Sequence, residues 1–272
     1  MLGFGQGLLA GAIFSRGWGV GQSAARRPMS DIVHEHWETY YTEVEDQPLS
    51  VSFDVDAAQR ELSEVFPRCA RLMVEIKGPG TGGRPGDHES SHLHAMENRI
   101  VELLAQSNVS CRFLARLTHA GNRELVFAVS EWDRFRTPVG RWLGEYDYQI
   151  ELDECEDWDY YNDWIRPTPQ IWQLIADRRV VDELISAGSD PAKPHHLKFV
   201  FIGLRERLAD VEEALRTRGY RRVDTGSDGS RLVMTASMPL DIDAISTESL
   251  LNQQLADEHG LSYDGWGASI VR

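Results

Sequence analysis

The chain of 272 residues has few cysteines, no long apolar run and no excess of positive charge. Its three cysteines, Cys69, Cys111 and Cys155, are odd in number and lack the close spacing of a metal site, so we expect reduced thiols in a cytoplasmic protein. No apolar run approaches the ~20 residues that a membrane-spanning helix needs. These absences argue against a disulfide scaffold, a cysteine-based metal site and a membrane protein.

Basic residues are scarce relative to acidic ones. There are 28 of the former against 43 of the latter, which gives a formal net charge of -15. Such a charge keeps a protein soluble and disfavours contact with the phosphate backbone of nucleic acid. We therefore expect no direct binding of nucleic acid, and a basic protein partner is easier to accommodate.

The first 28 residues contain no acidic residue and are rich in glycine. Their apolar segment, Leu8 to Phe14, is short, and the basic pair Arg26 and Arg27 follows it, which is the reverse of an export signal. We predict an upstream extension over 1–28, either disordered or the product of a misassigned start, before a folded part that begins at Met29. A cleaved signal is the alternative.

Alternation of apolar and polar residues predicts strands, and apolar residues at helical spacing predict helices. In the first half we expect, in order, strands over 37–41, 49–55 and 70–76, a helix over 91–106, strands over 109–117 and 124–129, a helix over 134–143 and a strand over 146–152. From the third strand onward the order is β-α-β-β-α-β, the ferredoxin-like arrangement, here preceded by an extra β-hairpin.

The second half repeats this order. We expect a helix over 175–187, a strand over 197–202, a helix over 205–218, strands over 220–224 and 231–237, a helix over 245–259 and a strand over 266–271. Crossover rules then predict a four-stranded antiparallel sheet with both crossover helices on one face. The predicted fold class is α+β, with two ferredoxin-like domains in tandem, 29–157 and 175–272.

A connector over 158–174 joins the two predicted domains and is dense in aromatic residues. They are Trp158, Tyr160, Tyr161, Trp164 and Trp172. Trp and Tyr combine a large apolar surface with one polar group, which suits packing at a crease between domains. A groove for a partner peptide is the alternative interpretation. Packing is favoured, because aromatic side chains are most often buried.

Two segments of the second half carry a resemblance to a known family. LISAGSDP at 184–191 and LADEHGLSYDGWG at 255–267 are similar to the opening and closing signatures of the family regulator of ribonuclease activity B. The segment 37–164, with EDQP at 45–48 and WDYY at 158–161, resembles the DUF695 domain, a bacterial domain of unknown function.

The resemblance implies a ferredoxin-like fold and a non-catalytic, inhibitory role without a cofactor. The implied partner is the endoribonuclease RNase E, or another degradosome component, whose binding alters RNA processing. Members of the inhibitor family usually continue past YDGWG into a long acidic tail, whereas the sequence given ends at Arg272. If that tail carries part of the nuclease contact, we expect a different partner.

The YDGWG motif allows two interpretations. In the functional one, Trp266 is an exposed anchor and Asp264 offers a charge to a basic partner, since Trp and Arg dominate interface energetics. In the structural one, Asp264-Gly265 is a turn before the last strand and Trp266 packs in the core, which the Asp-Gly turn signal favours. Asp190, before Pro191, likewise indicates first a helix stop and turn. The hypothetical interaction residues are Tyr263, Asp264, Gly265, Trp266 and Asp190.

Catalytic patterns are weak. His88, Glu89 and His92 match HExxH, in which two histidines one helical turn apart bind zinc, so a metal-dependent hydrolase is the alternative function. Pro85 and Gly86 precede this pattern directly, which puts His88 in the first turn or outside the helix. We therefore expect no metal site, with His88 and His92 as the only candidate ligands.

Two binding patterns also fail. The glycine-rich loop 78–83 lacks the Lys-Ser/Thr ending of a phosphate-binding loop. Phe199 and Phe201 suggest an RNA-stacking strand, but the strand 231–235 offers no aromatic partner. We predict a protein without catalytic activity that acts by protein–protein contact; a structural module whose halves mainly bind each other is a third possibility. The sequence leaves open the partner, the oligomeric state and the role of the first domain.

Overall fold

The computed structural model describes residues 12–14, 36–155, 157–226 and 228–272. The chain divides into two compact units, one of residues 24–167 and one that joins residues 1–23 to residues 168–272. Each unit contains one antiparallel sheet with helices packed against it, so the expected α+β class is confirmed. Of the predicted extension 1–28, only the strand Ala12–Phe14 lies among the described residues.

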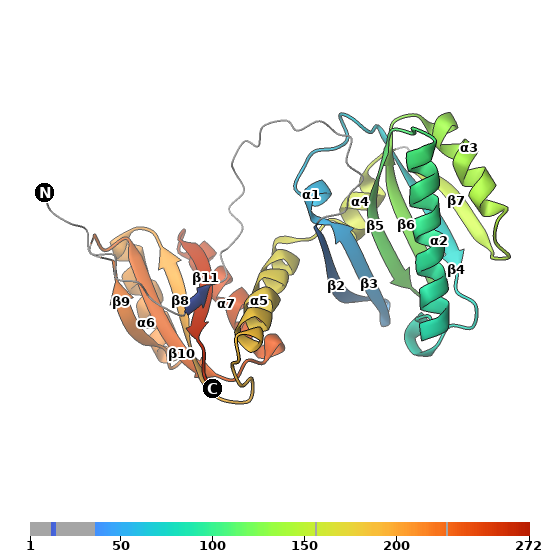
Figure 1. Ribbon diagram of the computed structural model, residues 1–272. Helices are drawn as coiled ribbons and strands as arrows, with labels where there is room; N and C mark the ends of the chain where they lie inside the picture. Colours follow the sequence, from blue (N-terminus) through green and yellow to red (C-terminus); the bar gives the residue numbers. More distant parts are fainter. Residues whose placement is uncertain (1–11, 15–35, 156, 227) are drawn as a thin grey trace, which may run out of the picture. The chain divides into compact units, whose positions relative to one another are not determined.

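The unit of residues 24–167 contains a six-stranded antiparallel sheet in the order β2-β3-β5-β6-β4-β7. Its strands are β2 (Trp37–Val44), β3 (Gln47–Asp54), β4 (Arg68–Glu75), β5 (Cys111–His119), β6 (Asn122–Val129) and β7 (Ile150–Cys155). Its helices are α1 (Val55–Ala58), α2 (Asp87–Gln106), α3 (Trp132–Leu143) and α4 (Asp159–Trp164), with a 3-10 turn η1 (Thr81–Gly83). Helices α2 and α3 pack side by side on the sheet (Figure 1).

The main core of this unit lies between the sheet and helices α2 and α3. The residues that predicted the helix, Leu93, Met96, Ile100 and Leu104, are all buried in it. The helix begins at Asp87, four residues earlier than predicted, because the chain becomes helical directly after Gly86. Acidic residues in the first turn, Asp87 among them, suit the positive end of the helix dipole.

The first hairpin has a tighter turn than predicted. Only Glu45 and Asp46 form it, with φ of 50° and 61°, the left-handed values that a two-residue hairpin turn of this type requires. Gln47 and Pro48, which lie between the two predicted strands 37–41 and 49–55, already belong to β3. Proline is tolerated there because it stands at the start of the strand.

Much of the predicted aromatic connector folds as part of this unit. Tyr161 is buried, and the Trp158 indole donates a hydrogen bond to the Phe66 carbonyl oxygen at 2.9 Å. The Tyr40 hydroxyl donates to the carbonyl oxygen of Ile165 at 3.3 Å. Trp158 and Tyr161 of the connector therefore pack within this unit, whereas Trp164 is 40% exposed. Two free cysteines, Cys69 and Cys155, lie directly opposite each other on β4 and β7.

The other unit contains a five-stranded antiparallel sheet in the order β1-β11-β8-β10-β9. Its strands are β1 (Ala12–Phe14), β8 (His195–Ile202), β9 (Arg221–Thr225), β10 (Arg231–Met238) and β11 (Ser262–Ser269), and its helices are α5 (Pro169–Ser186), α6 (Arg205–Thr217) and α7 (Ile242–Glu258). All three helices contribute to one core, together with Phe199, Phe201 and Trp266 of the sheet. The predicted four strands thus gain a fifth, β1, at the edge of β11.

Two boundaries in this unit differ from the predictions for physical reasons. Helix α5 begins at Pro169 rather than at residue 175, because Thr168 caps it by accepting a hydrogen bond from the Ile171 amide at 3.3 Å. Strand β11 begins at Ser262 rather than at residue 266. The Asp264-Gly265 pair is therefore inside the strand and is not a turn that precedes it.

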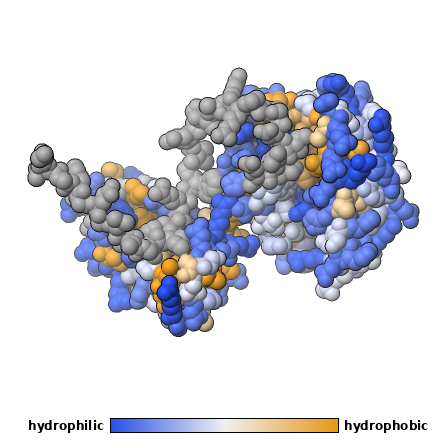
Figure 2. Space-filling model, in the orientation of Figure 1, coloured by the Kyte–Doolittle hydropathy of each residue, from blue (hydrophilic) through white to orange (hydrophobic). Residues whose placement is uncertain are grey.

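None of the helices within the described ranges is both long enough and apolar enough to cross a bilayer. Figure 2 shows a visible surface that is mostly hydrophilic, with hydrophobic residues in scattered patches. Scattered patches of this kind are normal on a folded protein.

Candidate functional site

The YDGWG motif forms a β-bulge in β11. Tyr263 pairs with Phe201 of β8 and Trp266 pairs with Phe199, so β11 uses one more residue than β8 between the two pairs. Gly265 has a φ of 85°, a left-handed value that glycine adopts without strain. Because of the extra residue, Tyr263 and Trp266 both point into the core, whereas residues three apart on a regular strand point to opposite faces.

Trp266 is fully buried and makes a specific hydrogen bond. Its indole Nε1 donates to Oδ1 of Asp177 on α5 at 2.8 Å. The same carboxylate oxygen accepts from Gln173 Nε2 at 2.8 Å and from Ser249 Oγ of α7 at 3.1 Å. The other oxygen, Oδ2, is buried without a hydrogen-bond partner. We call Gln173, Asp177, Ser249, Tyr263 and Trp266 the Asp177 network.

Burial dominates the electrostatics of this network. The Asp177 side chain is fully buried, and its desolvation raises the carboxyl pKa to about 6. Hydrogen bonds from Trp266, Gln173 and Ser249 favour the ionised form and oppose this rise in pKa. The Tyr263 hydroxyl lies 3.4 Å from Ser249 Oγ, and burial raises its pKa well above the ordinary value. The network joins α5, α7 and β11 and holds the bulge in place.

Sequence reasoning did not identify Asp177. The signal was present, because Gln173, Asp177, Val180 and Leu184 follow helical spacing and are all buried. A carboxylate on the apolar face of an amphipathic helix needs a polar partner. That partner is Trp266, which lies far away in the sequence, so only the fold reveals the pair.

The structure separates the predicted interaction residues into two places. Asp264 is exposed on the bulge, while Tyr263, Gly265 and Trp266 are buried. Asp190 lies near the other end of β11, where its amide donates to the Val271 carbonyl oxygen at 2.8 Å. Seven residues of extended chain, roughly 20 Å, separate Asp264 from that contact. The two aspartates therefore do not form one site.

The HExxH residues have structural contacts on α2. Both His88 and His92 are exposed in its first two turns. Glu89 accepts hydrogen bonds from the Tyr148 hydroxyl at 3.0 Å and from the Lys77 amide at 3.0 Å. The His92 and Tyr148 rings stack with centroids 5.5 Å apart. The part of the chain that the structure describes contains no three His, Cys, Asp or Glu side chains placed to hold a metal ion.

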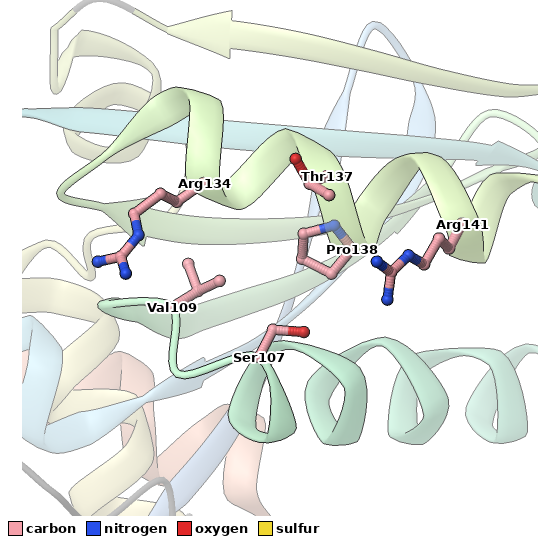
Figure 3. Close-up of a pocket in the computed structure, with 6 residues that line it drawn as sticks. All are labelled: Ser107, Val109, Arg134, Thr137, Pro138 and Arg141. Carbon is pink, nitrogen blue, oxygen red and sulfur yellow. The ribbon is translucent and has the colours of Figure 1, made fainter.

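An open depression of about 220 Å³ lies between the end of α2 and helix α3, and Figure 3 shows the side chains that line it. It is lined by Ser107, Val109, Arg134, Thr137, Pro138 and Arg141. Pro138 lies inside α3 and has no amide hydrogen to donate to the carbonyl group one turn earlier. The lining includes no His, Cys or carboxylate group, so it offers neither a general base nor a strong nucleophile.

A second depression, of about 370 Å³, lies between α6 and the turn from β9 to β10. Arg205, Arg222 and Arg231 line it together with Glu212. Glu212 pairs with Arg222 at 3.3 Å, whereas Arg205 and Arg231 form no ion pair with any described residue. This concentration of positive charge in an acidic chain was not predicted, because the three arginines are spread over more than twenty positions of the sequence.

The aromatic residues that suggested RNA stacking are not on an open surface. Phe199 and Phe201 are fully buried beneath the helices of their unit. Stacking with unpaired bases requires exposed rings. These two side chains therefore stabilise the core.

Comparison with known families matches each half of the chain separately. Residues 35–165 match the model of DUF695, a family of unknown function. Residues 174–268 match the model described as regulator of ribonuclease activity B, or RraB. The chain contains a DUF695 domain followed by an RraB domain. Both parts of the resemblance are thereby confirmed. No curated protein matches the chain.

The RraB match includes Asp177, Ser249, Tyr263 and Trp266 of the Asp177 network, and Gln173 lies one residue before its start. It also includes the half-buried Asp190 and the exposed Asp264. The match begins at residue 174, in the second turn of α5, and β11 ends one residue beyond the match. The DUF695 match covers residues 35–165, and so it includes α4. The bulged YDGWG strand and its buried carboxylate partner therefore both belong to the RraB domain.

Proposed function

We propose that this protein is a non-catalytic regulator that acts by binding another protein through its RraB domain. The observation that carries the proposal is the match of residues 174–268 to regulator of ribonuclease activity B. That match includes both the turn at Asp190 and the YDGWG bulge. A role in regulating a ribonuclease follows from the family.

RNase E, or another component of the degradosome, is the first candidate partner in this proposal. The chain has a formal net charge of -15, which suits a basic surface on the partner. A cytoplasmic location belongs to the same proposal, since an RNA-processing partner works there. The proposed contact involves protein surfaces and needs no cofactor.

Within this proposal the motif residues have different roles. Asp264 contacts the partner, because it is the exposed residue of the bulge. Tyr263, Gly265 and Trp266 are positioning residues that hold the bulge through the Asp177 network. Asp190 supplies a second, separate contact near the other end of β11, where it is half-buried.

The test is capture of RNase E from nuclease-treated host lysate, followed by measurement of affinity with the purified enzyme. Charge reversal of the exposed carboxylate, Asp264→Lys, is expected to weaken binding at least about tenfold, the equivalent of losing one charge-assisted contact. Asp190→Asn removes a charge but keeps the oxygen that accepts from the Ala192 amide at 3.1 Å. We expect a smaller loss for this variant.

Asp210→Lys is the matched control, because Asp210 is exposed on α6 and makes no hydrogen bond or ion pair with any described residue that a lysine would break. Equal losses for Asp264→Lys and Asp210→Lys would show that only the overall charge matters. Absence of RNase E and of every degradosome component from the captured material would contradict the proposed partner. Trp266 is unsuitable for this test, since its replacement changes the core.

We also infer that both domains are ferredoxin-like. The support is the strand order, which is β11-β8-β10-β9 in the RraB domain and β7-β4-β6-β5 in the DUF695 domain. In each case the first strand of the β-α-β-β-α-β run lies between the third and the fourth. An experimental structure in which β4 and β6, or β8 and β10, were not neighbours would contradict this fold.

A further inference from the structure

A row of polar side chains crosses the DUF695 sheet on the face that α2 covers. Tyr41, Ser50, Thr118 and Arg123 are successive partners in register across β2, β3, β5 and β6. The next row contains Thr39, Ser52 and Arg116, followed by the core residue Leu125. On this same face, helices α2 and α3 lie over the end of the sheet away from β2. Strands β2 and β3 extend beyond the two helices (Figure 1).

Arg116 in the second row is paired with a carboxylate. Its Nη1 donates to both carboxylate oxygens of Glu97 on α2, at 3.0 and 3.1 Å. Its Nη2 donates to Ser52 Oγ at 3.3 Å. Glu97 and Ser52 are themselves buried. Among the described residues, Glu97 is the buried carboxylate near these arginines, and Arg116 already engages it.

Arg123 in the first row is not partnered. Its side chain is 6% exposed, and both Nε and Nη1 are buried without a hydrogen-bond partner. Burial and, to a smaller extent, the like charge of Arg116 lower the pKa of this guanidinium to about 10, although the charge of Glu97 opposes the change. The group still carries its charge at neutral pH. A buried cation without a counter-ion is costly, so its retention calls for an explanation.

Two hydroxyl groups beside Arg123 are also available. Thr118 is its direct partner on β5, and Ser50 is the next residue along the row. Neither hydroxyl makes a hydrogen bond to any described residue. Neighbouring side chains in such a row have Cβ atoms about 5 Å apart, so all three groups can reach one small ligand. Arg84 lies over the ring of Tyr41, at 5.7 Å from its centroid, and adds positive charge at the end of the row.

We propose that the DUF695 domain binds a carboxylate group at Arg123, with the Ser50 and Thr118 hydroxyls as further donors. Arg116 is already paired with Glu97, so the buried Arg123 guanidinium keeps one positive charge without a counter-ion, which a monoanion neutralises. A phosphate dianion would overcompensate it. The carboxylate can belong to a small organic acid or to the terminus of a peptide, because both present the same group. This inference does not depend on the partner of the RraB domain.

The test follows the Nε–H signal of Arg123 by nitrogen NMR in the full chain at constant ionic strength. Acetate represents a small organic acid, N-acetylalanine a peptide terminus, and N-acetylalanine amide the same molecule without its charge. We expect saturable shifts with at least one of the two carboxylates and none with the amide. The stronger of the two carboxylates then identifies the source. Sodium chloride and inorganic phosphate complete the series.

Arg123→Met should abolish saturable binding, with at least about a tenfold loss of affinity, because it removes the charged donor. Its melting temperature without ligand should stay equal or rise, since an unpaired buried charge has been removed. Arg141→Met is the matched control, because Arg141 is exposed on α3 and outside the row. Arg141→Met should bind carboxylate as the unmodified chain does. Binding to the variants is followed by the NMR signal of another residue in the row, because Arg123→Met lacks the Arg123 Nε–H group.

Thr118→Val removes one hydroxyl but keeps the shape and the charge of the row. It tests the proposed carboxylate site if Arg123→Met does not fold. It should weaken carboxylate binding several-fold. Shifts with chloride equal to those with acetate would overturn the proposal in favour of charge screening. Saturation by phosphate alone would overturn the choice of ligand. A large fall in the melting temperature of Arg123→Met, together with no response to either carboxylate, would show that Arg123 only supports the fold.

Discussion

Asp177 is a carboxyl group for which ionisation is costly in the folded state. Its pKa rises from 3.8 to about 6 because it is buried, although three donors share one of its oxygens. The folded protein therefore holds this proton to a higher pH than the unfolded chain does. The contribution of Asp177 to stability is complete below pH 4 and is lost as the pH rises to about 6.

Asp177→Asn should remove this pH dependence. The shift corresponds to a free energy of unfolding on the order of 3 kcal/mol at neutral pH. We expect the variant to match the unmodified chain near pH 4 and to be the more stable one at pH 7. Urea unfolding at a series of pH values measures this, with Asp210→Asn on α6 as an exposed control. A parallel pH dependence in both proteins would contradict the assigned pKa.

Residue-level contacts set the limit of sequence reasoning here. The burial of Trp266 was the favoured structural interpretation, since an Asp-Gly pair before an apolar stretch suggests a turn into the core. The contacts of Trp266 with Asp177 and of Arg116 with Glu97 could not be predicted. They join residues on different elements, and a shift of one residue in strand register would place them on opposite faces.

The loop between β4 and α2 packs closely against the turn between β5 and β6. A Cβ atom on Gly83 would lie 2.5 Å from the backbone nitrogen of Gly121, and the φ of Gly83 is 71°. Gly78, at the start of the same loop, has a similar φ of 64° but nothing within 4 Å of an added Cβ. An alanine at either position would therefore adopt the same unfavourable left-handed φ. Only at Gly83 would its Cβ also collide with neighbouring backbone atoms.

Gly78→Ala should lower the free energy of unfolding by about 1–2 kcal/mol, the ordinary cost of a left-handed alanine. Gly83→Ala should cost clearly more, because backbone atoms must move to make room for the methyl group. Chemical denaturation of the two variants and the unmodified chain gives the comparison. Equal losses would show that the loop shifts freely and does not pack on the turn.

At the level of elements, the order of strands and helices followed from periodicity, whereas the boundaries did not. The start of α5 depends on the Thr168 cap, and the extent of β11 depends on a bulge that the Asp-Gly turn signal concealed. The strand β1 was missed because Ala12–Phe14 stands in a glycine-rich segment without alternation. Caps and bulges are single-residue features, so pattern averages do not detect them.

Over the whole molecule, each unit has a core of its own. Leu215 is fully buried in the core of the RraB domain, and Ile100 is fully buried in that of the DUF695 domain. Truncation of a large core residue to alanine costs roughly 2–5 kcal/mol. We expect Leu215→Ala and Ile100→Ala each to lower the stability of its own unit by such an amount.

Hydrogen exchange measured along the chain distinguishes the two units. In Leu215→Ala, amides of α6 and β8 should lose protection while those of α2 and β5 keep it within about 0.5 kcal/mol, and Ile100→Ala should show the reverse. Loss of protection in both units after either substitution would mean that they unfold as one cooperative body.

Cys69 and Cys155 face each other across β4 and the outer strand β7 of the DUF695 sheet, so oxidation of the two thiols would change how β7 is held. Burial raises the pKa of both thiols, that of Cys69 to about 12, so the reactive thiolate is scarce at neutral pH. A two-electron oxidant that converted the two thiols to a disulfide would link β7 covalently to β4. The chain between Cys69 and Cys155 would then form a closed loop. In a reducing medium, β7 is held to β4 by non-covalent contacts alone, which are hydrogen bonds, ion pairs and the packing of Ile150 and Leu152 against the core.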